Sequence, residues 1–407
     1  MHLSDRLKQF FSRDTVLIWT LVLAGILIYL NALPNEMFWD DNDFILNNAY
    51  IKDWQHWPHF FRDNIIAGTH LISNYWRPLL QIVFAIEWHL WADWFPGWHA
   101  VSIITHAIAA ALLFVLLKTL FSNRALAFLT AAMFLVHPAQ NEAVVYPNSL
   151  GDSLANCFVF VGLILFARFR ASGLAAPRSP DWWLALLAYP LALLSKETGI
   201  LFLAYLILCD WILRPSQEPL RRKAIVLARA LWPFLLVAVI YMALRATVLN
   251  FNNSFNFYKE ENILTAHASV RLMTFFRVLS IYAGVLFIPY ELRVERLLDP
   301  ATKFFQPEVM FGAGLCLTLL WLAWHHRRRS PIVTFGVLWF FAGILPTSNL
   351  FVIINALVYE HFLYTALVGI WLAVFWYLLR VSDGKAHRRR ILWIGLTILF
   401  TAFAVRD

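Results

Sequence analysis

Long uncharged apolar runs dominate the pattern of hydrophobic and polar positions along the chain. The runs Thr15 to Leu33 and Trp98 to Leu117 contain no Asp, Glu, Lys or Arg, and each is close to the roughly 20 residues that an α-helix needs to cross a bilayer. No small-residue cleavage site follows the first run, which is therefore interpreted as a retained anchor and not as a signal peptide. The pattern predicts an all-α, polytopic membrane protein.

Composition supports the same class. The chain is 60% hydrophobic and only 14% of its residues are charged, against roughly 25% in soluble domains. Its net charge of +8 comes largely from basic clusters in short loops, at Arg221 to Lys223, Arg327 to Arg329 and Lys385 to Arg390. Such clusters are typical of cytoplasmic loops, so no nucleic-acid partner is expected. The three cysteines are widely spaced and indicate neither a disulfide framework nor a metal site.

The charge distribution also predicts the topology of the first third of the chain. Arg6, Lys8 and Arg13 place the N-terminus in the cytoplasm. The first span then leads to an outer segment, 34–97, which has eight acidic and three basic residues and is rich in tryptophan. Because tryptophan favours the membrane interface, this first outer loop is expected to contain amphipathic juxtamembrane helices.

The remaining apolar runs predict ten further spans in a single domain, 1–407. With the first, they lie at about 15–33, 98–117, 125–140, 153–168, 182–195, 198–213, 224–249, 308–324, 331–346, 360–379 and 391–405. Two other stretches, 79–92 and 271–288, are expected not to cross, with 271–288 in the membrane plane or re-entrant, because crossing there would put basic clusters on both sides. About eleven crossings place the C-terminus on the outer, periplasmic side.

Ionisable groups gather on the outer side of this topology. They are Asp40, Asp41, Arg77, His99, His106, His137, Glu142, Asp152, Lys196, Glu197, Arg245, Glu360 and His361. Ionisable side chains at membrane depth are costly and usually functional.

Each of these groups also has a purely structural interpretation. The two adjacent aspartates could form a solvated loop or helix cap, Lys196 and Glu197 an interfacial ion pair, and Arg77 an interface anchor. His99 and His106 are seven residues apart, on one helical face, where a packing pair is favoured over a metal site. A divalent ion in the acidic cluster stays possible, although no dedicated ligand set is visible. The shared location on one face favours a functional site.

The residue types on this face suit transfer of a group from a lipid phosphate. A carboxylate near water can act as general base for a hydroxyl acceptor, and lysine or arginine can hold a departing phosphate. A groove between spans can hold an isoprenoid chain. No Walker-type or dinucleotide glycine motif is present, so a soluble nucleotide donor is not indicated.

A series of short motifs carries a resemblance to a known family. In order they are Trp39-Asp40-Asp41, Tyr75-x-Arg77-Pro78-Leu79, His99-x6-His106, Phe134-x2-His137-Pro138-x3-Glu142-Ala143-Val144, Ser195-Lys196-Glu197, Leu345-Pro346-Thr347-Ser348-Asn349 and Glu360-x2-Leu363-Tyr364. This series, from about residue 38 to 366, resembles the membrane part of the transmembrane and tetratricopeptide-repeat O-mannosyltransferases. Those enzymes are C-type (GT-C) glycosyltransferases, as are the protein O-mannosyltransferases.

The resemblance implies an activity and a set of residue roles. Enzymes of this kind use a polyprenyl-phosphate-linked sugar as donor, act on the lumenal or periplasmic face and are expected to invert the anomeric centre. Asp40 or Asp41 would be the catalytic base, and Arg77, Lys196 and Arg245 would bind the donor phosphate. The remaining residues would shape the pocket, namely His99, His106, His137, Glu142, Glu197, Glu360, His361 and Tyr364.

The sequence departs from the family pattern at two points. His361 stands where the family would have arginine, and the repeat domain is expected to be missing after Asp407. The shorter chain suggests a bacterial relative in the inner membrane, with a protein Ser/Thr, glycan or lipid as acceptor.

Two hypotheses from other classes remain. A flippase or transporter for a lipid-linked glycan should show internal repeats and polar groups near the midplane, and neither is visible. A non-catalytic partner in an envelope complex would leave the acidic pair dispensable.

Overall fold

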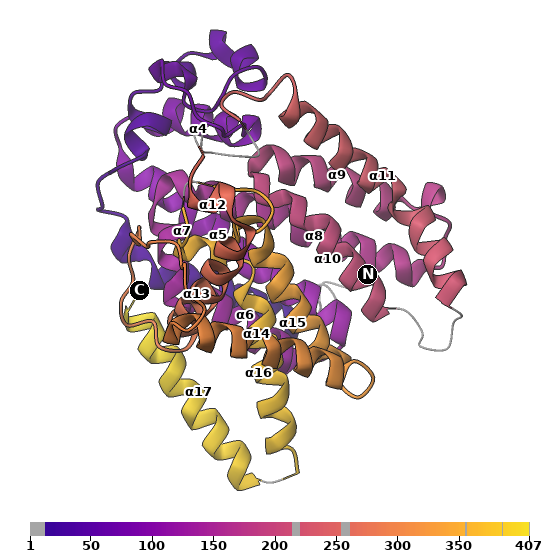
Figure 1. The fold of residues 1–407 in the computed structure, drawn as a ribbon. Helices are drawn as coiled ribbons and strands as arrows, with labels where there is room; N and C mark the ends of the chain where they lie inside the picture. Colours follow the sequence, from indigo (N-terminus) through magenta and orange to yellow (C-terminus); the bar gives the residue numbers. More distant parts are fainter. Residues whose placement is uncertain (1–12, 214–219, 254–260, 355, 385, 407) are drawn as a thin grey trace.

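The computed structural model describes residues 13–213, 220–253, 261–354, 356–384 and 386–406. These described residues form helices joined by short turns and contain no β-strand. Figure 1 shows the first outer loop at the top of the bundle and the turn between the last two helices at the bottom. The predicted Arg6, Lys8, Lys385 and Asp407 lie outside the described residues. The prediction of an all-α, polytopic membrane protein is confirmed.

Six helices are long and apolar enough to span a membrane. They are α2 (Arg13–Ile28, continued by the short η1), α5 (Phe95–Phe121), α8 (Leu150–Ser172), α11 (Leu220–Ala246), α13 (Ala268–Phe287) and α14 (Pro307–His326). Three shorter apolar helices are α6 (Arg124–Val136), α15 (Pro331–Ile344) and α16 (Leu367–Ser382). Helices also occupy the other predicted spans, as α9 (Pro180–Ser195), α10 (Leu201–Leu213) and α17 (Ala386–Arg406).

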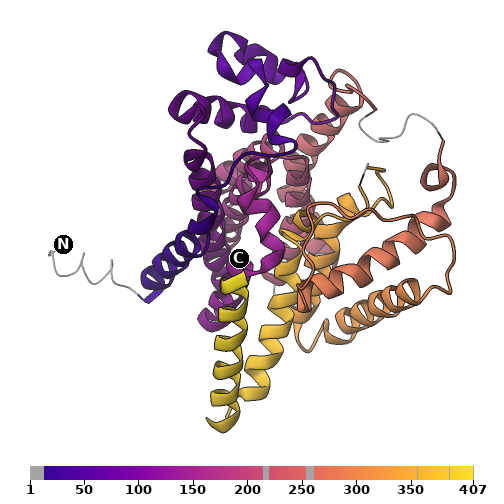
Figure 2. The same ribbon diagram turned by 90° about the vertical axis from the view of Figure 1, so that its left-hand side faces the viewer.

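Length and composition do not establish which of these helices cross. The count of eleven crossings therefore stays a prediction. So does the in-plane placement of 271–288, because α13 is itself long enough to cross. Figure 2 shows α13 and α14 strongly inclined to the nearly parallel pair α16 and α17.

Two predicted spans end or begin elsewhere in the structure, because short local turns interrupt the apolar pattern. The span predicted at 125–140 ends at Val136, since Pro138 disfavours helical backbone at the preceding residue, and His137 is extended with φ −77° and ψ 124°. The span predicted at 360–379 begins only at Leu367, after the short turn η10 (Glu360–Leu363). Both turns carry candidate site residues.

The centre of the bundle is closely packed. The rings of Tyr205 on α10 and Trp339 on α15 stack with centroids 3.7 Å apart. Helices α15 and α16 touch through Gly336 and Gly369, where a Cβ on Gly336 would lie 2.3 Å from the carbonyl oxygen of Gly369. Small residues at such contacts let two helix backbones approach closely within a membrane.

The first outer loop folds into short helices with a hydrophobic core of their own. They are η2 (Asn42–Leu46), α3 (Ala49–Lys52), η3 (Trp54–Phe61), η4 (Ala67–Thr69) and α4 (Pro78–Trp91). Ile45, Ile51, Phe60 and Phe84 are fully buried in this core, which also includes Trp98 at the start of α5. The loop therefore packs as a cap on the bundle. Its predicted position along the membrane surface stays a prediction.

Candidate functional site

Asp41 is a buried carboxylate that joins two distant segments. It follows α2 and η1, and its side chain is completely buried. Oδ2 accepts a hydrogen bond from the backbone N–H of Phe38 at 3.2 Å, and Oδ1 accepts one from the N–H of Asn148 at 2.9 Å. Burial raises the pKa of Asp41 to about 7, although both N–H donors act in the opposite direction. Asp41 thereby fixes the first outer loop to the turn η6 (Pro147–Ser149).

Asp40 is half-buried and differs from its neighbour. Within the described part of the chain, no group donates a hydrogen bond to its carboxylate. Burial raises the pKa of Asp40, Asp43 and Glu295 raise it further, and Arg77 opposes them. The preceding Trp39 has φ 54°, a conformation that is uncommon for a bulky residue and often marks a functional site. Asp40 therefore keeps its acceptor atoms available for a ligand.

Two ion pairs lie on the Arg77 side of Asp40, one partly buried and one buried. Arg77 precedes α4 and is 7% exposed, and its Nε and Nη2 both lie 2.9 Å from Oε2 of Glu197. The ring of Tyr75 lies against the same guanidinium, with 4.5 Å from Cζ to the ring centroid. Beside this pair, Lys196 Nζ lies 2.6 Å from Oδ2 of Asp152.

Arg245, the third predicted phosphate ligand, donates its hydrogen bonds to backbone carbonyl groups. Its Nη1 donates to the carbonyl of Leu249 at 2.7 Å, and its Nη2 donates to the carbonyl of Asn74. The structure thus brings Arg77 and Lys196 together, but each of the three predicted cations already has protein partners. The three cations lie beside the carboxylates Asp152 and Glu197, and the charge of Arg77 also acts on Asp40.

Two further hydrogen-bonded clusters are centred on Glu142 and on Glu360. Glu142 accepts from the backbone N–H of His361 at 3.0 Å, and its Oε1 lies 2.6 Å from His361 Nδ1. Glu360 accepts from the backbone N–H of Arg293 at 2.8 Å and from Nη2 of Arg296 at 2.9 Å. Burial raises the pKa of Glu360, and the two arginine donors oppose that shift.

Sequence reasoning missed Arg293, Glu295 and Arg296. They lie in the irregular segment between α13 and α14, where no hydrophobic period marks an element. The only available signal was the alternation of charged and apolar residues from Glu291 to Glu295. Nothing in that alternation indicates which carboxylate the arginines meet.

The two sides of the site meet around Tyr359 and Trp39. The rings of Trp39 and Tyr146 stack at 6.4 Å, and the ring of Tyr359 lies 6.5 Å from that of Trp39. Tyr359 also stacks on His361 at 5.2 Å. Burial raises the pKa of the Tyr359 phenol, and the charges of Glu295, Glu142 and Asp40 contribute to that shift. The ring of Trp39, the residue before Asp40, therefore contacts the segment that carries His361, the partner of Glu142.

Three of the four predicted pocket histidines bind backbone carbonyls inside the bundle. His99 Nε2 lies 3.1 Å from the carbonyl of Asn35, and His137 Nε2 lies 3.0 Å from that of Leu286. His106 Nδ1 lies 2.8 Å from the Tyr364 hydroxyl, and its Nε2 lies 3.2 Å from the Leu135 carbonyl. These contacts suit packing, and a role for them in a pocket stays a prediction.

No group of three or more His, Cys, Asp or Glu in the described ranges is placed to hold a metal ion. The described acidic residues around Asp40 therefore present no ready-made ligand set for the divalent ion that the sequence left possible.

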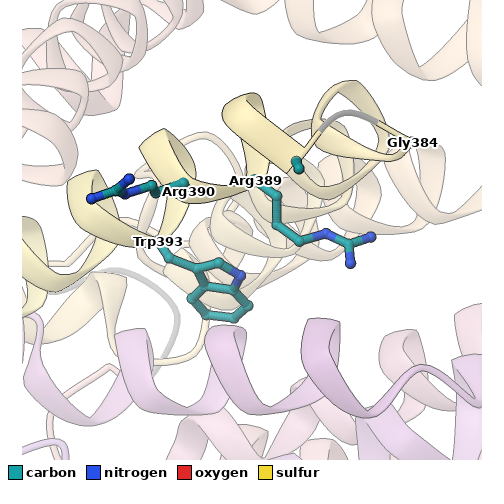
Figure 3. Close-up of a pocket in the computed structure, with 5 residues that line it drawn as sticks. Gly384, Arg389, Arg390 and Trp393 are labelled. Atoms are coloured by element: carbon teal, nitrogen blue, oxygen red, sulfur yellow. The ribbon is translucent and has the colours of Figure 1, made fainter.

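A hollow lies at the opposite end of the molecule from the first outer loop. It measures about 420 Å³ and is lined by Gly384, Ala386, Arg389, Arg390 and Trp393, at the turn between α16 and α17. Figure 3 shows Trp393 between the two arginine side chains. It has no carboxylate in its lining and is remote from Asp40, so it is not the candidate site. A smaller cavity of about 140 Å³ lies beside Glu295 and Arg296.

Comparisons with known proteins bear on what such a site does. No protein-family model and no solved structure matches the chain. Over 201 residues the chain is 31% identical to protein O-mannosyl-transferase Tmtc1 of Drosophila melanogaster, covering 48% of this chain and 22% of that protein. Over 192 residues it is 33% identical to protein O-mannosyl-transferase TMTC1 of Homo sapiens, covering 44% and 21%.

A longer match has lower identity. Over 377 residues the chain is 23% identical to protein O-mannosyl-transferase F38B6.6 of Caenorhabditis elegans, covering 86% of this chain and 49% of that protein. The matches thus span between about a fifth and a half of these relatives' length. The resemblance that the motifs predict is confirmed: this helical membrane chain is similar to TMTC-type protein O-mannosyl-transferases.

Proposed function

We propose that this chain is a membrane glycosyltransferase, which moves a mannose residue from a polyprenyl-phosphate donor to a hydroxyl group of a protein acceptor. The names of the similar proteins support a mannosyl group and a protein acceptor. The lipid-phosphate donor and the outer (periplasmic or lumenal) face are our own inference, from the chemistry of the outer residues. We also propose that the chain lies in a bacterial inner membrane.

The observation that carries the proposal is the placement of Asp40. Its half-buried carboxylate has no hydrogen-bond donor among the described residues, lies near Arg77 and follows Trp39, whose ring contacts those of Tyr146 and Tyr359. Aromatic side chains beside a carboxylate can stack on the apolar face of a sugar ring. Asp41 does not offer the same possibility, because its two oxygens already accept backbone hydrogen bonds.

The transfer step assigns Asp40 as general base. The acceptor hydroxyl oxygen forms a bond to the anomeric carbon of the sugar while the bond from that carbon to the phosphate oxygen breaks. The hydroxyl proton goes to Asp40, and the electron pair of the broken bond leaves with the polyprenyl phosphate. A base with a raised pKa is better matched to proton transfer near neutral pH than an ordinary aspartate.

The departing phosphate gains negative charge, which cations near Asp40 would stabilise. Arg77 and Lys196 are the candidates, and Arg245 adds positive charge near Glu197. Glu197 and Asp152 hold the two candidates in place before the donor arrives. Binding of the phosphate then requires Arg77 or Lys196 to share its donors between a carboxylate and the ligand.

The test is transfer by the purified full chain in lipid nanodiscs. Radiolabelled polyprenyl-phosphate mannose and a serine/threonine-containing peptide are supplied, and label on the peptide is measured for the wild type, Asp40→Asn and Asp43→Asn. We expect label with the wild type and Asp43→Asn, and at least about a hundredfold less with Asp40→Asn. Wild-type rates for Asp40→Asn would contradict the mechanism.

A control separates transfer from lipid movement. The same nanodiscs, loaded with donor on one leaflet, report movement of the donor between leaflets. Donor movement without peptide labelling would instead support the flippase hypothesis.

A further inference from the structure

The hollow at the turn between α16 and α17 lies where the packed face of α17 leaves the bundle. Leu396 and Phe403 are buried on this face, and Phe403 contacts His137 at the end of α6, with ring centroids 5.1 Å apart. Arg389 precedes Leu396 by the same seven residues that separate Leu396 from Phe403, so the three share one face of the helix. Arg389 is nevertheless exposed, because the α16–α17 hairpin projects beyond the rest of the bundle (Figures 1 and 2). The packed face therefore ends in an uncovered arginine.

Trp393 repeats this arrangement one turn further along α17. Phe400, seven residues later, stacks on Phe375 of α16 with centroids 6.2 Å apart, whereas Trp393 is exposed and lines the hollow (Figure 3). Tryptophan favours the membrane interface, where its ring contacts lipid and its N–H stays near water. The hollow measures about 420 Å³, within the size range of small-molecule sites. It therefore has room for a polar headgroup beside an apolar ring.

The two arginines of the hollow keep hydrogen-bond donors available for a ligand. Arg390 has no ion pair within the described ranges of the chain, and Arg389 has only an exposed contact of 3.4 Å with Asp383. Other basic residues near helix ends have closer partners: Lys118 and Arg124 pair with Asp14, Arg168 with Asp181, and Arg170 with Asp210. The hollow thus concentrates positive charge that the protein does not neutralise.

The sequence of the hairpin adds to this charge. Positions 380–390 contain five basic residues and one acidic residue, which give a net charge of +4 with His387 neutral. Guanidinium groups bind phosphate oxygens with two parallel hydrogen bonds, and clusters of basic residues at the end of a membrane-spanning helix attract anionic lipids. A zwitterionic lipid would bring a positive group of its own into this charge. The hollow therefore favours an anionic ligand.

The exposed side of α17 offers a path for an acyl chain. Ile394 and Ile398 follow Arg390 at steps of four residues, so the three side chains lie one above the other along the helix. Both isoleucines are more than half exposed. A phosphate bound at Arg390 places the hydrocarbon of the same molecule against these aliphatic side chains. A free phosphate ion would leave them without a partner.

We propose that this hollow binds the headgroup of an anionic membrane phospholipid, in the leaflet away from the candidate site. Arg389 and Arg390 bind the phosphate, Trp393 lies against the glycerol backbone, and an acyl chain follows Ile394 and Ile398. The bound lipid fills the space beside the first turns of α17, where no side chain of the bundle covers the packed face. The site does not depend on the sugar-transfer reaction.

The test is lipid binding to the purified full chain, measured by native mass spectrometry. Phosphatidylglycerol and phosphatidylcholine with the same acyl chains are titrated, and the affinity of the first bound lipid is determined for each. The variant is Arg389→Gln/Arg390→Gln. Its matched control, Arg328→Gln/Arg329→Gln, removes the same charge from two exposed arginines in the turn between α14 and α15. Melting temperatures check the folding of both.

We expect the wild type and the control to bind phosphatidylglycerol about tenfold more tightly than phosphatidylcholine, the order that two arginines at a charged lipid surface supply. In Arg389→Gln/Arg390→Gln the preference should fall to about twofold or less. A diazirine on the acyl chain of phosphatidylglycerol should label the peptide that contains Ile394 and Ile398 in the wild type. Absence of label from that peptide would contradict the proposal.

Other results would also overturn it. Equal affinities of the wild type for the two lipids would exclude charge selectivity, and equal losses of preference in both double variants would assign it to the basic end as a whole. Displacement of phosphatidylglycerol by inorganic phosphate at the same concentration would indicate a site for a soluble anion. Polyprenyl phosphate that binds more tightly than phosphatidylglycerol, and loses its binding in Arg389→Gln/Arg390→Gln, would assign the hollow to the sugar-donor lipid.

Discussion

Asp41 and Asn148 are 107 residues apart in the chain and are joined by a hydrogen bond of 2.9 Å from the Asn148 backbone N–H to the Asp41 carboxylate. This bond ties the first outer loop to the turn that begins α8. The neighbouring Asp40 has no such donor among the described residues. Two adjacent aspartates therefore have different environments, which predicts different effects of the same substitution.

Substitution of the two aspartates by asparagine should separate activity from stability. Asp40→Asn should lower transfer at least about a hundredfold, because it removes the base, while its melting temperature stays close to that of the wild type. Asp41→Asn should lower the melting temperature by several degrees, because an amide offers one acceptor oxygen to two backbone N–H donors. Transfer assays and thermal unfolding of both variants check this. The reverse assignment would make Asp41 the base.

The rate of transfer should depend on pH through Asp40. Burial raises the pKa of Asp40 above the 3.8 of an ordinary aspartate, and the base must be ionised to accept a proton. We therefore expect kcat/KM to fall as the pH decreases, with a midpoint above 3.8. Glu295 adds to the raised pKa, so Glu295→Gln should move the midpoint to lower pH. A fall in the residual kcat/KM of Asp40→Asn with the wild-type midpoint would exclude Asp40 as the titrating base.

Asp40, Arg77 and Glu142 could be singled out from the sequence as candidate site residues, because ionisable residues near span ends are rare. Their hydrogen-bond and ion-pair partners could not be predicted. Lys196 and Glu197 are adjacent in the chain, which suggested an ion pair between them. In the structure, Lys196 pairs with Asp152 and Glu197 pairs with Arg77. Side chains of adjacent residues in an extended segment point in opposite directions. Lys196 is extended, with φ −159° and ψ 149°.

The stability of the folded protein should also depend on pH, through Asp41. Burial raises the pKa of Asp41 from 3.8 to about 7, so the folded state holds this proton more tightly than the unfolded state. The resulting stabilisation is complete below about pH 3.8 and is lost as the pH rises through 7. Asp41→Asn removes this contribution. Melting temperatures from pH 5 to 8 should decrease more steeply for the wild type than for Asp41→Asn; equal slopes would contradict the assignment.

Helix boundaries at the site could not be predicted from the sequence either. Apolar runs continue through His137 and through Leu363, yet both places are short turns. At His137 the following proline is a local signal, although proline also occurs inside helices of this bundle, as at Pro190 and Pro233. The contacts of Glu142 with His361 and of Glu360 with Arg296 hold the segments after these turns, and they join residues far apart in the sequence.

Removing one partner of the Arg77–Glu197 pair should be strongly destabilising. Glu197→Gln leaves a guanidinium that is 7% exposed without its counter-charge, and such changes cost about 3–5 kcal/mol. Asp383→Asn is the control, because Asp383 and Arg389 form an exposed pair at 3.4 Å that should contribute nothing measurable. Chemical unfolding in detergent compares the two. A loss for Glu197→Gln no larger than for Asp383→Asn would show that Arg77 finds another anion.

The placement of α13 can be tested by labelling. Both ends contact segments near the site: α12 (Ile263–Ala266) at its start adjoins the smaller cavity, and the Leu286 carbonyl at its end accepts from His137. If α13 lies along the outer surface, Ser269→Cys and Ile288→Cys should both react with a membrane-impermeant thiol reagent in intact cells. The background lacks the three native cysteines, and Arg328→Cys, in a basic loop predicted to be cytoplasmic, should react only after permeabilisation. If only one end of α13 reacts in intact cells, the helix crosses the membrane and the predicted eleven-span topology is wrong.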